Sequence, residues 1–336
     1  MSLWKLSAGT ACVVGKKQLK TDVLPTTAYI MLGEKCRNHC RFCSQSRDSS
    51  ARADLLSRVT WPEVPGEEAA QAVGAAFRAG RLQRACLQVV HNEQSWQTSV
   101  DALERLVRES AVPVCISSAI DSVAQAKELI ARGADRICIS LDAATPEIFR
   151  QVKGGRWQER WNLLTRCAAE LPGRVSTHLI VGLGETEQEI IETIAHCLDN
   201  GISVGLFAFT PVRGTVWADR QPPAIGRYRR VQIAHFLLKT GYSRAVFRFQ
   251  NGILTGISLP VSEMKLILAG GTAFETSGCS GCNRPYYNER PGGVMYNYPR
   301  ALTGNEIQAA IAESGIIGIH AEQERRRAGC EMAGHQ

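Results

Sequence analysis

The sequence predicts an α/β fold of the (βα)8 TIM-barrel type, either closed or left as a partial arc of six strands. Segments with the length and apolar content of buried strands alternate with helical segments through most of the 336 residues. About eight strand-helix steps can be counted along the chain. The strand segments are apolar on both faces, as expected for a parallel sheet that helices cover.

The expected elements follow one another at regular intervals. The expected strands are Thr27–Leu32, Ala85–Val90, Val112–Ser117, Arg136–Leu141, Val175–Val181, Ser203–Phe209, Ala245–Phe249 and Thr272–Glu275. The expected helices are Glu67–Ala79, Ser95–Glu109, Asp121–Arg132, Pro146–Val152, Trp157–Glu170, Glu185–Leu198, Ile225–Thr240 and Ser262–Leu268. Right-handed crossovers would join these strands in one parallel sheet, with the active groups at the strands' carboxyl ends.

The chain divides into three parts. Residues 1–24 form a lead-in, residues 25–276 the barrel, and residues 277–336 a C-terminal extension with a cysteine-containing loop and tail. A chain of this length with 44% hydrophobic residues can bury one large core, so a separate second domain is not needed. Residues 44–66 are polar and rich in turn residues, which predicts a long loop of the kind that often carries function.

Composition limits the classes of partner. The net charge of +7, from 39 basic and 32 acidic residues, is mild and dispersed, so we expect no nucleic-acid partner. The run Arg325–Arg327 is read as a basic helix end, with docking of an acidic partner as the alternative. No apolar run has membrane-spanning length, so we expect no membrane association. The twelve cysteines are spread through the expected strands and helices, and no signal peptide precedes them, which favours the reducing cytoplasm.

The most informative stretch follows the first strand. It reads Cys36-Arg-Asn-His-Cys40-Arg-Phe-Cys43, and three thiolates at this spacing can hold three irons of a 4Fe-4S cluster. The fourth iron then lacks a protein ligand, so it can bind a small molecule. The alternative is a zinc knuckle completed by His39 or by a distant residue.

The CxxxCxxC spacing, with Phe42 directly before the last cysteine, resembles the radical S-adenosylmethionine (SAM) superfamily. The resemblance implies that the fourth iron binds the methionine group of SAM and that SAM is cleaved to a 5'-deoxyadenosyl radical. It places Phe42 beside the adenine. It also implies contacts to SAM after the second strand, where His91 and Glu93 are the candidates, and after the fourth strand, where Asp142 is the candidate for ribose or substrate. His91 could instead end its strand in a hydrogen bond, and Asp142 could cap a helix.

The end of the fifth strand carries a second resemblance to the superfamily. Ile180, Gly182 and Glu185 match the motif GxIxGxxE, which in the superfamily packs against adenine, while His178 stands where the first glycine is expected. Glycine lets the backbone approach a ligand, and an acidic residue at the start of a helix complements the helix dipole.

The C-terminal extension contains Cys279 and Cys282 in a glycine-rich CxxC loop. We favour an auxiliary 4Fe-4S cluster over a thiol-disulfide pair, completed by Cys12, Cys330, a serine, an arginine or a partner chain. The loop's position after the last strand predicts that it lies at the same mouth as the first cluster. The remaining cysteines are read as inert core residues, because free cysteine packs as a small hydrophobe: Cys86, Cys115, Cys138, Cys167 and Cys197.

Within the superfamily the chain resembles the biotin synthase-like branch, and most of all a subunit of the two-protein lipoyl synthases. The segments Leu56–Pro62 and Gly278–Pro285 carry this resemblance. It implies sulfur insertion at C6 or C8 of an octanoyl chain on a lipoyl carrier protein, with the auxiliary cluster as sulfur donor. The implied partners are a second radical SAM subunit and an electron donor such as ferredoxin or flavodoxin. The alternatives are a biotin synthase, a hydrogenase-maturase-like enzyme and a non-enzymatic iron-sulfur scaffold.

Overall fold

The computed structural model describes residues 2–289 and 292–316; Arg325–Arg327 and Cys330 lie outside the described residues. Its centre is a sheet in the order β10-β9-β8-β7-β6-β2-β1-β5. Six adjacent strands of this sheet are parallel. They are β2 (Thr27–Leu32), β6 (Arg84–Val89), β7 (Val114–Ser117), β8 (Arg136–Cys138), β9 (Val175–Val181) and β10 (Ser203–Ala208). The sheet is therefore a partial barrel. Of the two outcomes that the sequence predicts, a closed barrel or an arc of six strands, the structure shows the arc.

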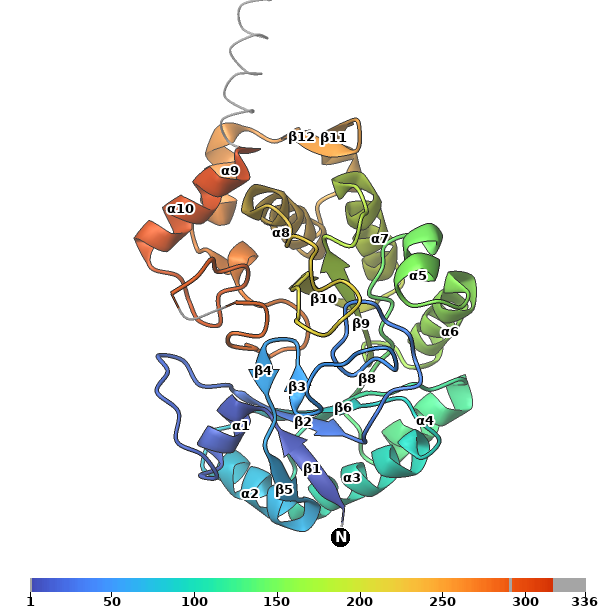
Figure 1. Ribbon diagram of the computed structural model, residues 1–336. Helices are drawn as coiled ribbons and strands as arrows, with labels where there is room; N and C mark the ends of the chain where they lie inside the picture. The colour runs from blue at the N-terminus through green and yellow to red at the C-terminus, as the bar shows by residue number, and fades with distance from the viewer. Residues whose placement is uncertain (1, 290–291, 317–336) are drawn as a thin grey trace, which may run out of the picture.

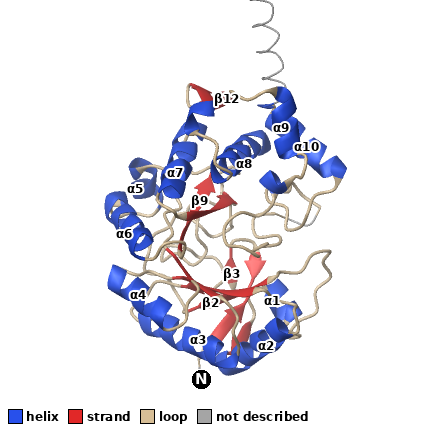
Figure 2. Ribbon diagram, turned by 180° about the vertical axis from the view of Figure 1, so that it is seen from behind, coloured by secondary structure: helices blue, strands red, loops and turns tan. Residues whose placement is uncertain are grey.

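Helices cover the outer face of the arc, as Figures 1 and 2 show. They are α2 (Gly66–Arg78), α3 (Ser95–Glu109), α4 (Val123–Ala131), α5 (Pro146–Val152), α6 (Trp157–Glu170), α7 (Glu187–Asp199) and α8 (Ile225–Lys239). All of them except α5 have an apolar side that joins the main core, and α5 packs in a second cluster of buried residues. The strands contribute residues such as Leu87, Ile116 and Leu179 with no exposed surface. This arrangement leaves the inner face of the sheet for a site.

Two further strands of the sheet come from segments that the sequence reads as irregular. Strand β1 (Leu3–Leu6), from the expected lead-in, pairs antiparallel with both β2 and β5 (Glu63–Pro65). Helix α1 (Ala8–Val13) follows β1, and Ser7 caps it by accepting from the Thr10 amide. The loop over 44–66 also holds the short hairpin of β3 (Leu55–Leu56) and β4 (Val59–Thr60).

The prediction of Ala245–Phe249 and Thr272–Glu275 as the last two barrel strands is wrong. Strand β11 (Phe247–Gln250) pairs antiparallel with β12 (Ile253–Ile257) in a separate hairpin. Residues Thr272–Phe274 form a 3-10 turn. The hairpin forms because Asn251 and Gly252 both adopt positive φ, the conformation that a tight two-residue turn requires. Helices α9 (Val261–Leu268) and α10 (Gly304–Ser314) complete this end of the molecule.

The C-terminal segment over residues 276–289 closes the open side of the arc in place of further strands (Figure 1). On one side, the Leu206 amide of β10 donates to Ser277 Oγ at 2.9 Å, and Asn288 Nδ2 donates to the Ala208 carbonyl at 2.9 Å. On the other side, Thr26 Oγ1 donates to the Gly281 carbonyl at 2.7 Å. The segment therefore bridges β10 and the start of β2, and it forms one wall of the barrel interior.

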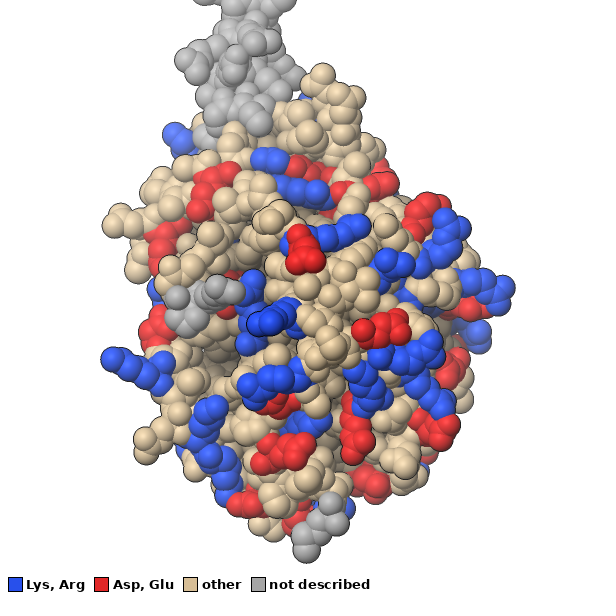
Figure 3. All heavy atoms as spheres, viewed as in Figure 1, with Lys and Arg blue, Asp and Glu red and all other residues tan. Residues whose placement is uncertain are grey.

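None of the described helices is both long and apolar enough to cross a membrane. On the face drawn in Figure 3, basic and acidic side chains are interspersed.

A buried histidine on α8 gives the fold a dependence on pH. Burial, with a smaller effect of Lys239, lowers the pKa of His235 from its ordinary 6.5 to about 4. The unfolded chain therefore takes up a proton between pH 6.5 and pH 4 that the folded chain does not, so stability falls on acidification. At 1.36 kcal/mol for each pKa unit, His235 accounts for a loss of up to about 3 kcal/mol. Urea unfolding at several pH values should show a shallower acid slope in His235→Gln; an unchanged slope contradicts this assignment.

Candidate active site

The three cysteines of the CxxxCxxC loop line one cavity of about 280 Å³ at the carboxyl ends of the parallel strands. The loop leaves β2 through Gly33, whose φ of 87° favours glycine. Two backbone hydrogen bonds fix the start of the loop. The Cys36 amide donates to the Gln45 carbonyl at 3.0 Å, and the Arg37 amide donates to the His91 carbonyl at 2.8 Å. Cys36, Cys40 and Cys43 are thereby held at the cavity that the strand ends form.

The cysteines fit an iron-sulfur cluster better than a zinc knuckle. Burial raises the pKa of Cys40 to about 12 and that of Cys43 to about 11, so thiolates at these positions require a bound cation such as iron. His39, the expected fourth zinc ligand, is about half exposed and bonds Asp48 at 2.6 Å. Among residues 2–289 and 292–316, no three His, Cys, Asp or Glu side chains are arranged for a single metal ion. A cluster does not need such an arrangement, because each of its cysteines binds a different iron.

The apolar wall of the cavity contains two of the predicted SAM-binding residues. Phe42 and Ile180 both line the cavity and pack against the same cluster of buried residues, which includes Phe209 and Trp217. An aromatic ring and an aliphatic side chain on one wall suit the faces of a flat base such as adenine. The structure thus brings Phe42 and Ile180 together, although they lie 138 positions apart in the sequence.

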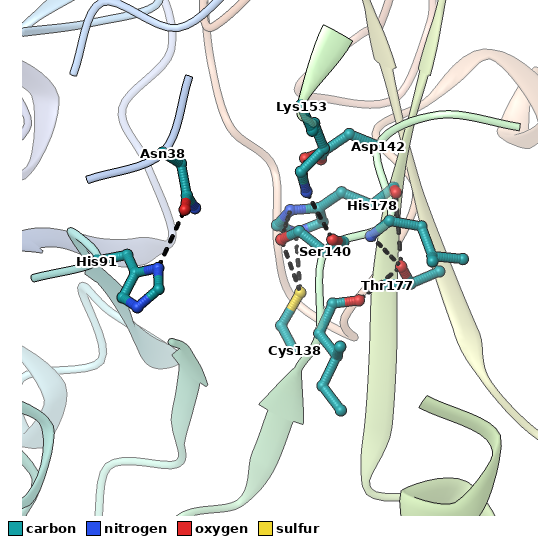
Figure 4. Close-up of polar contacts among 10 residues, drawn as sticks. Asn38, His91, Cys138, Ser140, Asp142, Lys153, Thr177 and His178 are labelled. Carbon is teal, nitrogen blue, oxygen red and sulfur yellow. Dashed lines mark hydrogen bonds and ion pairs between the residues drawn. The ribbon is translucent and has the colours of Figure 1, made fainter. Parts of the chain in front are cut away.

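The two candidates after the second parallel strand differ. His91 lines the cavity, and its Nδ1 lies 3.1 Å from Asn38 Oδ1 of the cysteine loop (Figure 4). Burial lowers the pKa of His91. Glu93 points elsewhere: its side chain is 78% exposed, forms an ion pair with Arg37 and is not among the cavity-lining residues. The geometry supports His91 as a contact to a ligand and gives no support to Glu93.

Asp142 lies on the opposite wall from His91, next to His178 (Figure 4). Its φ of 65° is unusual for a side chain other than glycine. Two backbone bonds to β9 hold it there, since the Asp142 amide donates to the His178 carbonyl and the Ile180 amide donates to the Asp142 carbonyl, both at 2.8 Å. Lys153 Nζ donates to the Asp142 carboxylate at 2.7 Å, so the expected helix cap is instead one half of a half-buried ion pair.

Gly182 and Glu185 build the turn after β9 rather than the cavity wall. Glu185 is buried, and its carboxylate accepts from the Gly182 amide at 2.7 Å and the Leu183 amide at 2.9 Å. Arg227 pairs with the same carboxylate at 2.8 Å, and burial raises the pKa of Glu185. Helix α7 begins two residues later with Thr186 as its cap. These two predicted residues shape the turn that follows Ile180, and neither lines the cavity.

Replacing Gly182 by alanine should destabilise the protein strongly. Gly182 has a φ of 104°, and a Cβ there would lie 3.0 Å from Pro223 Cδ. Gly173, with a φ of 73° and no atom within 4 Å of its Cβ position, is a matched control for the backbone conformation alone. We expect Gly182→Ala to lose about 1–3 kcal/mol more unfolding free energy than Gly173→Ala, because overpacking adds to backbone strain. Urea titration of both variants measures the difference, and equal losses would rule out this steric role.

Cys279 and Cys282 do not lie at the mouth where the sequence places them. They line a second, smaller cavity of about 30 Å³ deeper in the barrel, toward the amino ends of the strands. The reason is the inward course of the C-terminal segment, where Arg84 Nη1 donates to the Ser280 carbonyl at 2.9 Å. The two cavities share three wall residues, namely Gln88, His178 and Phe207. Cys12 lies on α1 and lines neither of these two cavities, so the geometry gives no support to Cys12 as a ligand.

Sequence reasoning missed two cationic residues of the first cavity, Lys153 and Arg160. Arg160 is largely buried and donates to the Ile120 carbonyl at 2.7 Å, and burial lowers its pKa. Both residues lie in or beside helices, so a search of strand ends does not find them. Lys153 follows the end of α5 and Arg160 lies on α6, so no single helical spacing relates the two residues in the sequence.

These features define a class of protein: a partial parallel barrel with a three-cysteine loop in a cavity at the strands' carboxyl ends. The Radical SAM superfamily profile matches residues 30–197, which is half of the chain, and the chain belongs to this superfamily. Membership implies a 4Fe-4S cluster and SAM as cofactors.

Similar proteins agree with this family. A protein named biotin synthase from Synechococcus sp. is 27% identical over 222 residues, covering 62% of this chain and 68% of the relative. Another from Mycobacterium tuberculosis is 26% identical, covering 65% of this chain and 60% of the relative. The chain thus spans about two thirds of the length of these relatives.

Solved structures support the fold. Methylornithine synthase (PylB) aligns with a TM-score of 0.51 at 16% identity, over 72% of this chain and 68% of that one. The FeFe-hydrogenase maturase HydG from Carboxydothermus hydrogenoformans aligns with a TM-score of 0.51 at 15% identity, over 86% and 66%.

Proposed function

We propose that this protein inserts sulfur into an octanoyl chain on a lipoyl carrier protein, acting in the cytoplasm with a second, related radical SAM subunit. The observation that carries the proposal is the pair of adjoining cavities. One is lined by Cys36, Cys40 and Cys43, the other by Cys279 and Cys282, and Gln88, His178 and Phe207 form the wall between them. A substrate carbon at this wall would lie beside both cavities.

The cysteines of the two cavities would bind two different clusters. Cys36, Cys40 and Cys43 would hold the SAM-binding cluster, and Cys279 and Cys282 an auxiliary cluster. When bound, these groups and SAM supply a 5'-deoxyadenosyl radical and sulfide sulfur, with the initiating electron coming from ferredoxin or flavodoxin.

The chain's own side chains bind and orient the reactants. Phe42 and Ile180 offer an apolar face for adenine, while Arg160 supplies positive charge at the cavity for a carboxylate. Met31, Leu56 and Phe207 give the cavity apolar surface that suits an alkyl chain and excludes water.

The test uses anaerobically reconstituted protein with SAM, a reductant and a carrier protein bearing either an octanoyl or an acetyl group. We expect 5'-deoxyadenosine to form with the octanoyl carrier in clear excess over the acetyl carrier, and mass spectrometry to detect sulfur on the octanoyl chain. Addition of the partner subunit should increase the fully thiolated product. Equal 5'-deoxyadenosine with both carriers and no sulfur on the chain would contradict the proposal.

Parallel assays separate the alternatives. Conversion of dethiobiotin would identify a biotin synthase, and the absence of 5'-deoxyadenosine under every condition would favour an iron-sulfur scaffold.

A further inference from the structure

Lys153 lines the first cavity and donates two hydrogen bonds to the end of the fourth parallel strand. Its Nζ donates to the Ser140 carbonyl at 2.8 Å and to Asp142 Oδ2 at 2.7 Å (Figure 4). The side chain of Lys153 is 12% exposed and that of Asp142 is 13% exposed, so both charges are largely removed from water. Loss of the cation from such a pair leaves an uncompensated buried charge. The direction of the Asp142 carboxylate therefore depends on Lys153.

The backbone holds both partners of this ion pair in place. Asp142 has a φ of 65° and two backbone hydrogen bonds to β9. Lys153 directly follows α5, and the carbonyl of the preceding Val152 accepts from the Arg41 amide at 2.9 Å. Arg41 lies between two cysteines of the CxxxCxxC loop. The cysteine loop, the end of α5 and the end of the fourth parallel strand therefore meet at the ion pair.

The ion pair leaves one oxygen of Asp142 free for a ligand. Lys153 occupies Oδ2, and no donor among the described residues reaches Oδ1. A carboxylate oxygen only accepts hydrogen bonds, so Oδ1 suits a ligand with hydroxyl groups. The neighbouring Ile180 belongs to the apolar surface that suits a base, and its amide donates to the Asp142 carbonyl at 2.8 Å. A nucleoside whose base lies on Ile180 would present its sugar hydroxyls next to that base.

The other cation of the cavity has a different environment. Arg160 lies on α6 and donates to the Ile120 carbonyl at 2.7 Å. In the described part of the chain, no hydrogen bond joins Arg160 to Asp142. Arg160 is thus available to a carboxylate of a ligand, whereas Lys153 already pairs with a carboxylate of the protein.

We propose that Lys153 is a positioning residue for SAM: it holds the Asp142 carboxylate toward the first cavity, where Oδ1 accepts from the ribose hydroxyls. Lys153 acts through Asp142 and makes no contact with SAM itself. The proposal concerns SAM, which membership of the superfamily implies, and it does not depend on the octanoyl chain as substrate.

The first test measures the binding of nucleosides to reconstituted protein without reductant, so that no turnover occurs. Equilibrium dialysis gives the dissociation constants of adenosine and of 2',3'-dideoxyadenosine, which lacks both ribose hydroxyls. We expect the wild type to prefer adenosine by about tenfold, because a hydrogen bond to a charged group is lost with the dideoxy compound. Lys153→Met should remove most of this preference, and Lys153→Arg, which keeps the charge, should retain most of it.

The matched control is Lys127→Met. Lys127 forms an ion pair with Glu170 at the same distance of 2.7 Å, but both side chains are about half exposed and neither lines the first cavity. This variant should keep the wild-type preference for adenosine. A wild-type preference in Lys153→Met, shown to be folded by circular dichroism, would overturn the proposal. An equal loss of affinity for both nucleosides would do the same, because it would indicate a purely structural role.

A second test asks whether Lys153 acts through Asp142. Asp142→Asn removes the charge at a backbone conformation that asparagine also adopts. We expect the double variant with Lys153→Met to bind SAM no more than about twofold more weakly than Lys153→Met alone, since both substitutions remove one shared interaction. Additive losses would overturn the proposal. The carrier assay is interpreted separately: the expected results here, in a protein that makes no thiolated octanoyl product, would uphold the role of Lys153 and reject the proposed function.

Discussion

Cys40→Ala should reduce 5'-deoxyadenosine formation at least about 100-fold, because loss of a direct cluster ligand exceeds the 10- to 100-fold cost usual for residues behind the ligands. Cys40 is the middle residue of the loop and lines the first cavity with Cys36 and Cys43. Two thiolates would be left to hold the cluster. The measurement is 5'-deoxyadenosine released by reconstituted protein under reducing conditions with SAM.

The matched control for this variant is Cys167→Ala, which removes a buried thiol on α6 that lines neither cavity. We expect it to lower stability, as cavity-forming substitutions do, without a loss of cleavage comparable to that of Cys40→Ala. Comparable losses in both variants would mean that the effect comes from folding, and the assignment of Cys40 as a ligand would fail.

Cys279→Ala should have the second largest effect, and this effect is on the yield of thiolated product rather than on the cleavage of SAM. The residue belongs to the second cavity, so its loss should reduce thiolated product at least about tenfold more than it reduces 5'-deoxyadenosine. The ratio of the two products in the same reaction measures this, because changes in protein concentration or folded fraction cancel. A variant that still thiolates its substrate in the wild-type ratio would show that Cys279 has no part in sulfur donation.

Much of the fold follows from local sequence. Strand β9 and helix α3 have the expected bounds, Val175–Val181 and Ser95–Glu109, because each is bounded by clear turn or cap residues and has one dominant periodicity. The late strands failed for a physical reason. Asn251-Gly252 is a strong signal for a tight hairpin turn, and it outweighs the apolar content that made Ala245–Phe249 read as a barrel strand.

The candidate site was predictable where a short motif defines it. Cys36, Cys40, Cys43 and Phe42 meet in one cavity because the loop that carries them is short and follows a strand. Glu93 was not predictable in the same way, since its side chain can turn to solvent and pair with Arg37. A position at the end of a strand does not decide whether a side chain points into the cavity or toward solvent.

The strand cysteines illustrate a limit of periodicity. In a parallel sheet both faces are apolar, so Cys86, Cys115 and Cys138 look like core residues whether they face the helices or the barrel interior. Only the registers of β6, β7 and β8, together with the inward course of the C-terminal segment, place them in one cavity with Cys279.

The central claim is that Cys36, Cys40 and Cys43 hold a cluster with one iron open to SAM. Electron paramagnetic resonance of the reduced, anaerobically reconstituted protein tests it most directly, with and without SAM. We predict the signal of a reduced 4Fe-4S cluster that changes on addition of SAM and is lost in Cys40→Ala. Zinc in place of iron at these cysteines, or a cluster signal that SAM leaves unchanged, would contradict the claim.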